Sequence, residues 1–121
     1  MAVTMVGQGI PWDASGLGVP VVIKDAVASE NVTYTARNGT ITTGGTAQNA
    51  AAANTSRNGF TIQNQSTGDL YISATGTAVA DRTSMKLVAG ATYEFPASGV
   101  PTTAISIIGA TTGQAFYAVE W

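Results

Sequence analysis

The chain has 121 residues, a formal net charge of -2, no histidine and no cysteine, and only 10% of its residues are charged. This inventory excludes Ser-His-Asp and Cys-His catalysis, disulfides and the usual zinc sites. The five basic residues are scattered along the chain, which argues against a nucleic-acid binder driven by counterion release.

A chain of this length is expected to form one domain around a single core. An isolated monomer usually relies on charge for solubility, so a weakly charged surface is compatible with packing among other protein copies; a small neutral domain is the alternative. The start of the chain has no basic region and only a short apolar run, so it predicts neither a secretory signal nor a membrane span. Synthesis in a cytoplasm is expected.

Residues 1–18 contain four glycines and Pro11, a density of turn residues that predicts an extended N-terminal arm. Trp12 lies in this arm and needs a packing partner, either its own domain or a neighbouring subunit. Residues 19–24, "VPVVIK", form a β-branched run typical of an edge or opening strand. We therefore expect an arm at 1–18 and a folded domain at 19–121.

The Asn38-Gly39 pair predicts a hairpin between the strand containing Tyr34 and the following "TIT". Residues 44–57 are ambiguous, because four consecutive alanines favour a helix whereas the flanking Gly, Asn and Thr do not. A second hairpin is predicted over residues 60–72, with its turn at 65–68.

Further strands are predicted near 85–88, at 92–95 after a turn at Gly90, and at 105–108 and 114–121. About eight short strands separated by turns predict an all-β fold, a single antiparallel β-sandwich or jelly-roll-like domain. In the last strand Trp121 shares a face with Tyr117 and Val119. We expect its ring to pack in the sandwich core, with a subunit interface as the alternative.

Seven carboxylates remain for chemistry. Glu94 and Glu120 lie in strands, and a pair facing one cleft is what glycoside hydrolysis requires. We expect instead that both point outward opposite apolar neighbours. Asp69 and Asp81 lie beside turns, where Asp bonds the local backbone, and neither belongs to a run of alternating oxygen ligands. We predict no catalytic residue, no metal and no cofactor.

Exposed tyrosines offer one binding alternative, because sugar rings stack on aromatic faces. The residues concerned are Tyr34, Tyr71, Tyr93 and Tyr117. We expect core or interface packing for most of them.

Several motifs follow one another in the second half of the chain. They are Asn54 with Arg57, "IQN" at 62–64, Leu-x-x-Gly-x-x-Tyr-Glu at 87–94, "GATTGQAF" at 109–116, and the pair Glu120-Trp121. In order and spacing, residues 44–121 resemble a family of small tailed-bacteriophage proteins encoded among the virion structural genes. Residues 1–43 are not covered by the resemblance.

The resemblance implies a non-enzymatic virion protein of β-sandwich type that is synthesised in the cytoplasm of a bacterial host. The expected role is capsid decoration (cement) protein: it binds the outer surface of the head, stabilises it, and has the major capsid protein or other virion proteins as partners. A tail, collar or head-fibre component is the alternative, including a host-receptor- or glycan-binding module. We expect a homotrimer at the capsid surface, with Trp12 and Trp121 as interface residues and with neither nucleic acid nor membrane as a partner.

Overall fold

The computed structural model describes residues 31–121, and Thr33–Trp121 form one compact unit. The expected arm at 1–18, Trp12 within it and the strand expected at 19–24 lie outside the described residues. The described elements are β1 (Thr35–Ala36), β2 (Gly39–Thr40), β3 (Gln48–Ala51), β4 (Phe60–Asn64), β5 (Leu70–Ser73), β6 (Met85–Leu87), β7 (Thr92–Phe95), the short 3-10 helix η2 (Ala97–Gly99), β8 (Ile105–Gly109) and β9 (Ala115–Glu120). No helix among them is long and apolar enough to cross a membrane.

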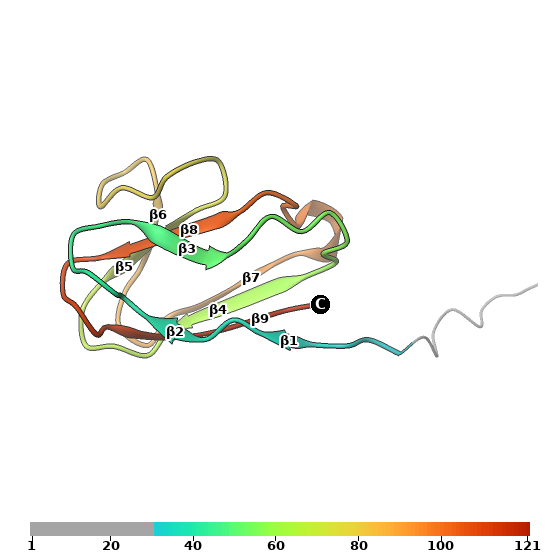
Figure 1. Ribbon diagram of the computed structural model, residues 1–121, viewed down its shortest axis with the longest axis horizontal. Coiled ribbons are helices and arrows are strands. Elements are labelled where there is room, and N and C mark those ends of the chain that lie inside the picture. The colour runs from blue at the N-terminus through green and yellow to red at the C-terminus, as the bar shows by residue number, and fades with distance from the viewer. Residues whose placement is uncertain (1–30) are drawn as a thin grey trace, which may run out of the picture. The chain divides into compact units, whose positions relative to one another are not determined.

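Two antiparallel sheets pack face to face as a β-sandwich, which confirms the predicted fold class (Figure 1). One sheet has the order β1-β9-β4-β7, with β2 also paired to β9, and the other has the order β3-β8-β5-β6. From β2 onward, successive strands lie in opposite sheets, except that β5 and β6 are neighbours. This alternating winding is the topology of a jelly roll.

The hairpin predicted at Asn38-Gly39 is wrong, because β1 and β2 both pair with β9 and not with each other. The Arg37 N–H donates to the Ala118 carbonyl at 2.7 Å, and the Asn38 side-chain oxygen accepts the Ala118 N–H at 3.4 Å. Asn38 thus replaces one bond of the ladder, and the chain continues alongside β9 instead of reversing.

The hairpin predicted over residues 60–72 is also wrong, although both strands are present. β4 belongs to one sheet and β5 to the other. The Asn64 amide donates to the Gly68 carbonyl at 2.7 Å, and its Oδ1 accepts the Ser66 N–H at 2.9 Å. These bonds hold the link so that it crosses between the sheets.

The ambiguous alanine-rich segment contains strand β3 and no helix. Gln48 and Asn49 pair with Ile107 and Ser106 of β8, and a bulge follows before Ala51 pairs with Ile105. Tertiary pairing therefore overrides the helix preference of the alanines.

The predicted turn at Gly90 is confirmed and includes a β-bulge. Asn64 of β4 faces two residues, since it accepts a hydrogen bond from the Gly90 N–H at 2.8 Å and donates one to the Ala91 carbonyl at 2.9 Å. Gly90 has a φ of 82°. This left-handed conformation is the one a glycine adopts at the first position of such a bulge.

The core lies between the sheets and is formed by the inward-facing residues of both, which alternate along each strand with outward-facing ones. Its buried apolar residues are Ile41, Ala50, Ala51, Phe60, Ile62, Leu70, Ile72, Leu87, Ile105, Ile107, Phe116 and Ala118.

Candidate interaction surface

A row of apolar and aromatic side chains lies on the outer face of β9. Because side chains alternate along a strand, Tyr117, Val119 and Trp121 point away from the core-facing residues Phe116 and Ala118. Tyr34 joins this row through its ring. We call these four residues, Tyr34, Tyr117, Val119 and Trp121, the β9 stripe. Tyr34 is 62% exposed and Tyr117 is 41% exposed, so part of the stripe is accessible.

Trp121 packs on this outer face and not in the core, so the core expectation for its ring is wrong. Its backbone N–H and carbonyl exchange hydrogen bonds with Gly59, at 3.1 and 3.0 Å. A Cβ atom at Gly59 would come within 2.2 Å of the indole, so only glycine leaves room for the ring. The Tyr34 ring meets the indole edge to face, with centroids 5.2 Å apart. The subunit-interface role of Trp121 stays a prediction.

Removing the indole by Trp121→Ala should lower the free energy of unfolding by about 1–2 kcal/mol, since the buried half of the ring no longer contributes and Tyr34 loses its aromatic partner. Gly59→Ala should have a similar effect, because the new methyl group displaces the ring. Urea denaturation measures both. Gly76→Ala is the matched control, because nothing lies within 4 Å of its Cβ position. Equal stability of the Gly59→Ala and Gly76→Ala proteins would show that the indole does not pack on Gly59.

A buried ionic network lies on the opposite face of the same strand. The Glu120 side chain is 3% exposed, and its two oxygens accept hydrogen bonds from Arg57 Nε at 2.7 Å and Arg37 Nε at 2.7 Å. The expectation that Glu120 points outward is therefore wrong. The alternation of β9 places this carboxylate on the core face, and a buried arginine compensates its charge there.

The Arg57 side chain is fully buried, and each of its nitrogens has a partner. Besides Glu120, it donates to the carbonyls of Pro101 at 2.6 Å, Thr103 at 2.9 Å and Ala52 at 2.6 Å. Its guanidinium also lies 5.7 Å from the centre of the Phe60 ring. Arg57 thus ties two loops to the end of β9, and four of its five N–H groups are bound within the domain.

Burial of the Glu120 carboxyl acts to raise its pKa, but hydrogen bonds and charge from Arg57 and Arg37 outweigh burial and lower the pKa below its ordinary value. The unfolded chain therefore binds the proton more readily than the native protein. The stabilisation is present above the unfolded pKa, about 4.3, and is lost as pH falls through the lower native value.

We therefore expect the free energy of unfolding to fall as pH drops below about 5, and this slope to become shallower in Glu120→Gln. Urea denaturation at a series of pH values measures it. Asp81→Asn is the control. Hydrogen bonds from the Thr83 hydroxyl and N–H lower the pKa of Asp81 as well, but this carboxylate is fully exposed, whereas Glu120 is buried. An unchanged slope in Glu120→Gln would contradict the role given to this carboxylate.

The two carboxylates considered for glycoside hydrolysis do not meet. Glu94 is exposed on β7, and its neighbours across the sheet, Thr61 and Val119, share the outer face. Glu120 lies on the inner face of that sheet. Within residues 31–121 no group of three or more acidic side chains lies close enough to hold a metal ion.

The tyrosines do not form one platform either. Tyr34 and Tyr117 lie on the outer face of the β1-β9-β4-β7 sheet, and Tyr71 lies on the outer face of the other sheet, opposite Ile108. Tyr93 packs against Phe95, with ring centroids 5.0 Å apart. A sugar-binding surface built from all four rings is therefore absent from the described structure.

Two buried polar residues, Arg57 and Asn64, were not identified from the sequence as structural centres. The available signal was their place in the quoted motifs, where Arg57 follows Asn54 and Asn64 ends "IQN". In the structure Asn54 accepts the Arg57 N–H at 3.2 Å, and its Oδ1 accepts the Ser56 N–H at 3.0 Å. The motif residues thus organise loops and strand ends.

Comparison of the chain with family models, with curated proteins and with solved structures found no match.

Proposed function

We propose that this protein is a non-enzymatic structural component of a bacteriophage virion. Within that class we propose a capsid decoration (cement) protein, which binds the outer surface of the head and stabilises it through contact with the major capsid protein. The observation that carries the proposal is the distribution of side chains on β9. The charged Glu120 is buried and paired with Arg57 inside the domain, and the aromatic residues of the β9 stripe lie on the outer face.

The internal network favours a scaffold over a catalyst. Glu120 and Arg57 are buried and paired with each other, and Asn64 is buried with its amide bound to two carbonyls. Such groups fix strand ends and loops but offer no free acid, base or nucleophile. A rigid domain of this kind suits a protein that works by covering and bridging its neighbours.

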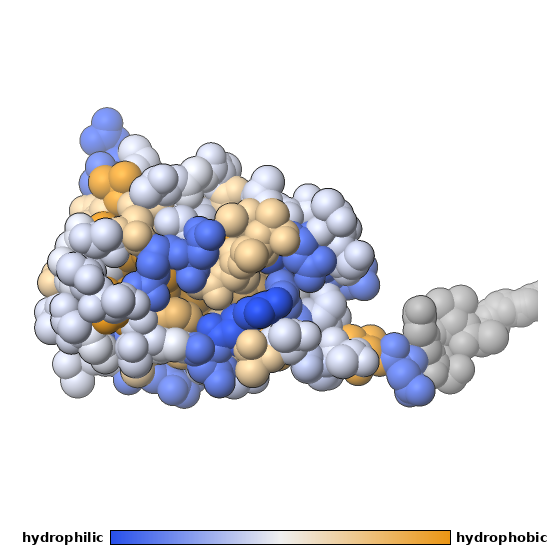
Figure 2. Space-filling model, in the orientation of Figure 1, coloured by the Kyte–Doolittle hydropathy of each residue, from blue (hydrophilic) through white to orange (hydrophobic). Residues whose placement is uncertain are grey.

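The surface chemistry supports protein–protein contact. Protein interfaces are depleted in charge at their centre and enriched in aromatic side chains, and the β9 stripe has this composition. Residues of intermediate hydropathy cover much of the side of the molecule that carries β1, β2 and β3, and a group of strongly hydrophilic residues (blue) lies across its centre (Figure 2).

Two further supports are analogies. The resemblance over residues 44–121 is to virion proteins, and jelly-roll domains recur in viral capsid proteins, although also in lectins and cupins. We propose a homotrimer with Trp12 and Trp121 at its interfaces, because closed symmetry multiplies weak contacts with a lattice.

The test uses purified particles of the parent phage, with copy number from mass spectrometry and location from cryo-electron microscopy. Copy numbers on the order of hundreds, with density on the head exterior, are the expected result for a lattice protein. About six or twelve copies, or density confined to the tail or collar, would overturn decoration in favour of a tail, collar or fibre role.

A binding experiment then asks whether the stripe is the contact. Particles lacking the protein are incubated with the purified protein or its variants and sedimented. Tyr117→Asp places a charge in the stripe and should abolish co-sedimentation, whereas Thr92→Asp, on the same sheet face but on β7, should not. Equal binding by both variants would exclude the stripe as the contact.

A further inference from the structure

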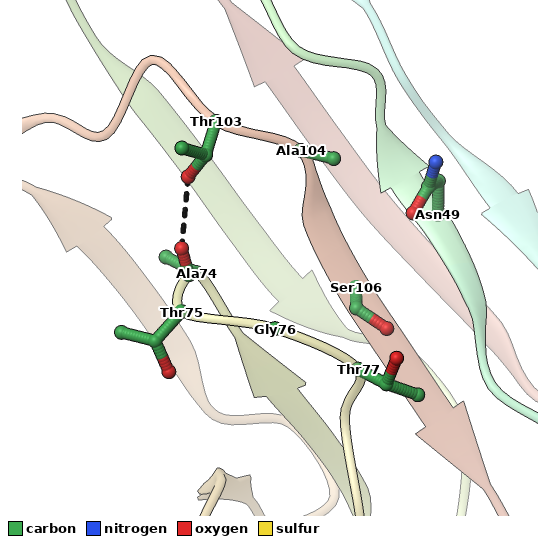
Figure 3. A pocket seen from close by; sticks show the side chains of 8 residues that line it. All are labelled: Asn49, Ala74, Thr75, Gly76, Thr77, Thr103, Ala104 and Ser106. Carbon is green, nitrogen blue, oxygen red and sulfur yellow. Dashed lines mark hydrogen bonds between the residues drawn. The ribbon is translucent and has the colours of Figure 1, made fainter.

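A hollow with a volume of about 390 Å³ lies on the outer side of the four-stranded sheet, away from the β9 stripe. Its walls come from three elements: β3 with Asn49, the start of β8 with Ser106, and the loop after β5 with Thr77 (Figure 3). Every lining side chain belongs to Asn, Ser, Thr, Ala or Gly. The hollow therefore contains hydroxyl and amide groups but no ionisable group and no aromatic ring.

The loop that forms one wall is held at both ends. The Thr103 hydroxyl donates to the Ala74 carbonyl at 2.8 Å, and the Ser106 hydroxyl accepts the Ala78 N–H at 2.9 Å (Figure 3 shows the first of these bonds). Ala78 is 2% exposed and Ser106 is 6% exposed, so the second attachment is buried. The hollow is thus largely pre-formed, and binding there would require little ordering of the loop.

Between these attachments several polar groups are free. Within residues 31–121, neither the Asn49 amide nor the Thr77 hydroxyl has a hydrogen-bond partner, and the same holds for the backbone N–H groups of Gly76 and Thr77. A Cβ atom at Gly76 would meet nothing within 4 Å, so the rim beside these groups is open. The hollow therefore offers hydrogen-bond donors and acceptors that no other residue within 31–121 pairs with.

The chemistry of this lining selects a class of ligand. A charged ligand would lose hydration without meeting an opposite charge, and an apolar ligand would leave the hydroxyl and amide groups unpaired. A neutral molecule with many hydroxyl groups avoids both costs. We propose that this hollow is a binding site for a neutral saccharide, with Asn49, Thr77 and the Gly76–Thr77 backbone as its hydrogen-bonding groups.

The affinity is expected to be weak, with a Kd of about 1 mM or above, because the site lacks an aromatic ring on which a sugar could stack. The site is separate from the β9 stripe and does not depend on the proposed virion role. Saccharide binding and capsid binding can therefore succeed or fail independently.

The test is NMR titration of the ¹⁵N-labelled full-length chain with glucose, galactose, mannose and N-acetylglucosamine, each up to about 100 mM. The expected result is a saturable shift of the Asn49, Gly76, Thr77 and Ser106 amides with at least one sugar. Glucuronate, which adds a negative charge to glucose, should bind no more tightly than glucose. Absence of a saturable shift with all four neutral sugars would overturn the proposal, and so would shifts centred on Tyr34 and Trp121.

Two variants test the assignment of the contacts. Thr77→Val keeps the side-chain shape and removes the hydroxyl, and Asn49→Ala removes the amide; each should weaken binding by about fivefold or more. Thr92→Val, an exposed threonine on β7, is the matched control and should leave the affinity unchanged. Spectra of the free variants establish that each is folded. Unchanged affinity in both Thr77→Val and Asn49→Ala would contradict the proposed site.

Discussion

Glu120→Ala is expected to lower the free energy of unfolding by about 3–5 kcal/mol, the cost of leaving a buried charge without its partner. The Arg57 side chain is 0% exposed, and three of its other N–H groups are bound to carbonyls, so the guanidinium is held away from water when the carboxylate is removed. Arg37 contributes less, because 39% of its side chain is exposed and water replaces the lost contact. For a domain of this size the loss corresponds to a fall in Tm of about 15–25 °C.

Calorimetry and urea denaturation measure the effect, and Glu94→Ala is the matched control. Glu94 is exposed on β7, so its removal should change the free energy of unfolding by no more than about 0.5 kcal/mol. The double variant Arg57→Met/Glu120→Leu should recover only part of the loss, since it removes both buried charges together but leaves the carbonyls of Pro101, Thr103 and Ala52 without their donor. A Glu120→Ala protein as stable as Glu94→Ala would show that the network does not stabilise the fold.

Asn64→Asp is the second substitution with a large expected effect, a loss of about 3–4 kcal/mol. Asn64 is 0% exposed, and its Nδ2 donates to the carbonyls of Gly68 at 2.7 Å and Leu87 at 2.8 Å. The aspartate has the same shape but places a carboxylate oxygen against two carbonyl oxygens. Both carbonyls lose their donor, and a negative charge is buried with hydrogen bonds from Ser66 but without a cation beside it.

Lowering the pH should partly restore the free energy of unfolding of Asn64→Asp. This response distinguishes an electrostatic cost from a packing defect. Burial without a cation raises the pKa of the new carboxyl in the native state, so protonation favours folding and the loss shrinks as pH falls. Urea denaturation at two pH values tests this expectation. Gln63→Glu, one residue earlier on β4 and pointing outward, is the control. A loss no greater than that of Gln63→Glu would contradict the structural role of Asn64.

The positions of strands were predictable from the sequence, but their pairing was not. The alternation in residues 60–64 and 70–73 marks two strands correctly, because it reflects burial of one face of each. Which sheet each strand joins depends on contacts far away in sequence. At Asn38-Gly39 the local turn preference is overridden by pairing with β9, about eighty residues later.

The candidate surface was only partly predictable, because it also depends on contacts between residues far apart in sequence. The alternation of the last strand correctly separates Tyr117, Val119 and Trp121 from Phe116, Ala118 and Glu120. The sequence placed the wrong face inside, because a glutamate ordinarily faces water. Its compensating partner, Arg57, lies 63 residues earlier, and the space for the indole depends on the register that brings Gly59 beside Trp121. Neither fact can be read from local sequence.

The central place of β9 also has a consequence for biosynthesis. Residues 115–120 pair with β4 on one side and with β1 and β2 on the other, so a nascent chain that has reached only β8 lacks the strand that joins these parts of the sheet. This sheet can therefore be completed only after β9 has left the ribosome, and the long sequence separation of the pairings of β9 makes that step slow compared with local structure formation. Until then the apolar faces of the earlier strands remain uncovered and open to chaperones or to aggregation.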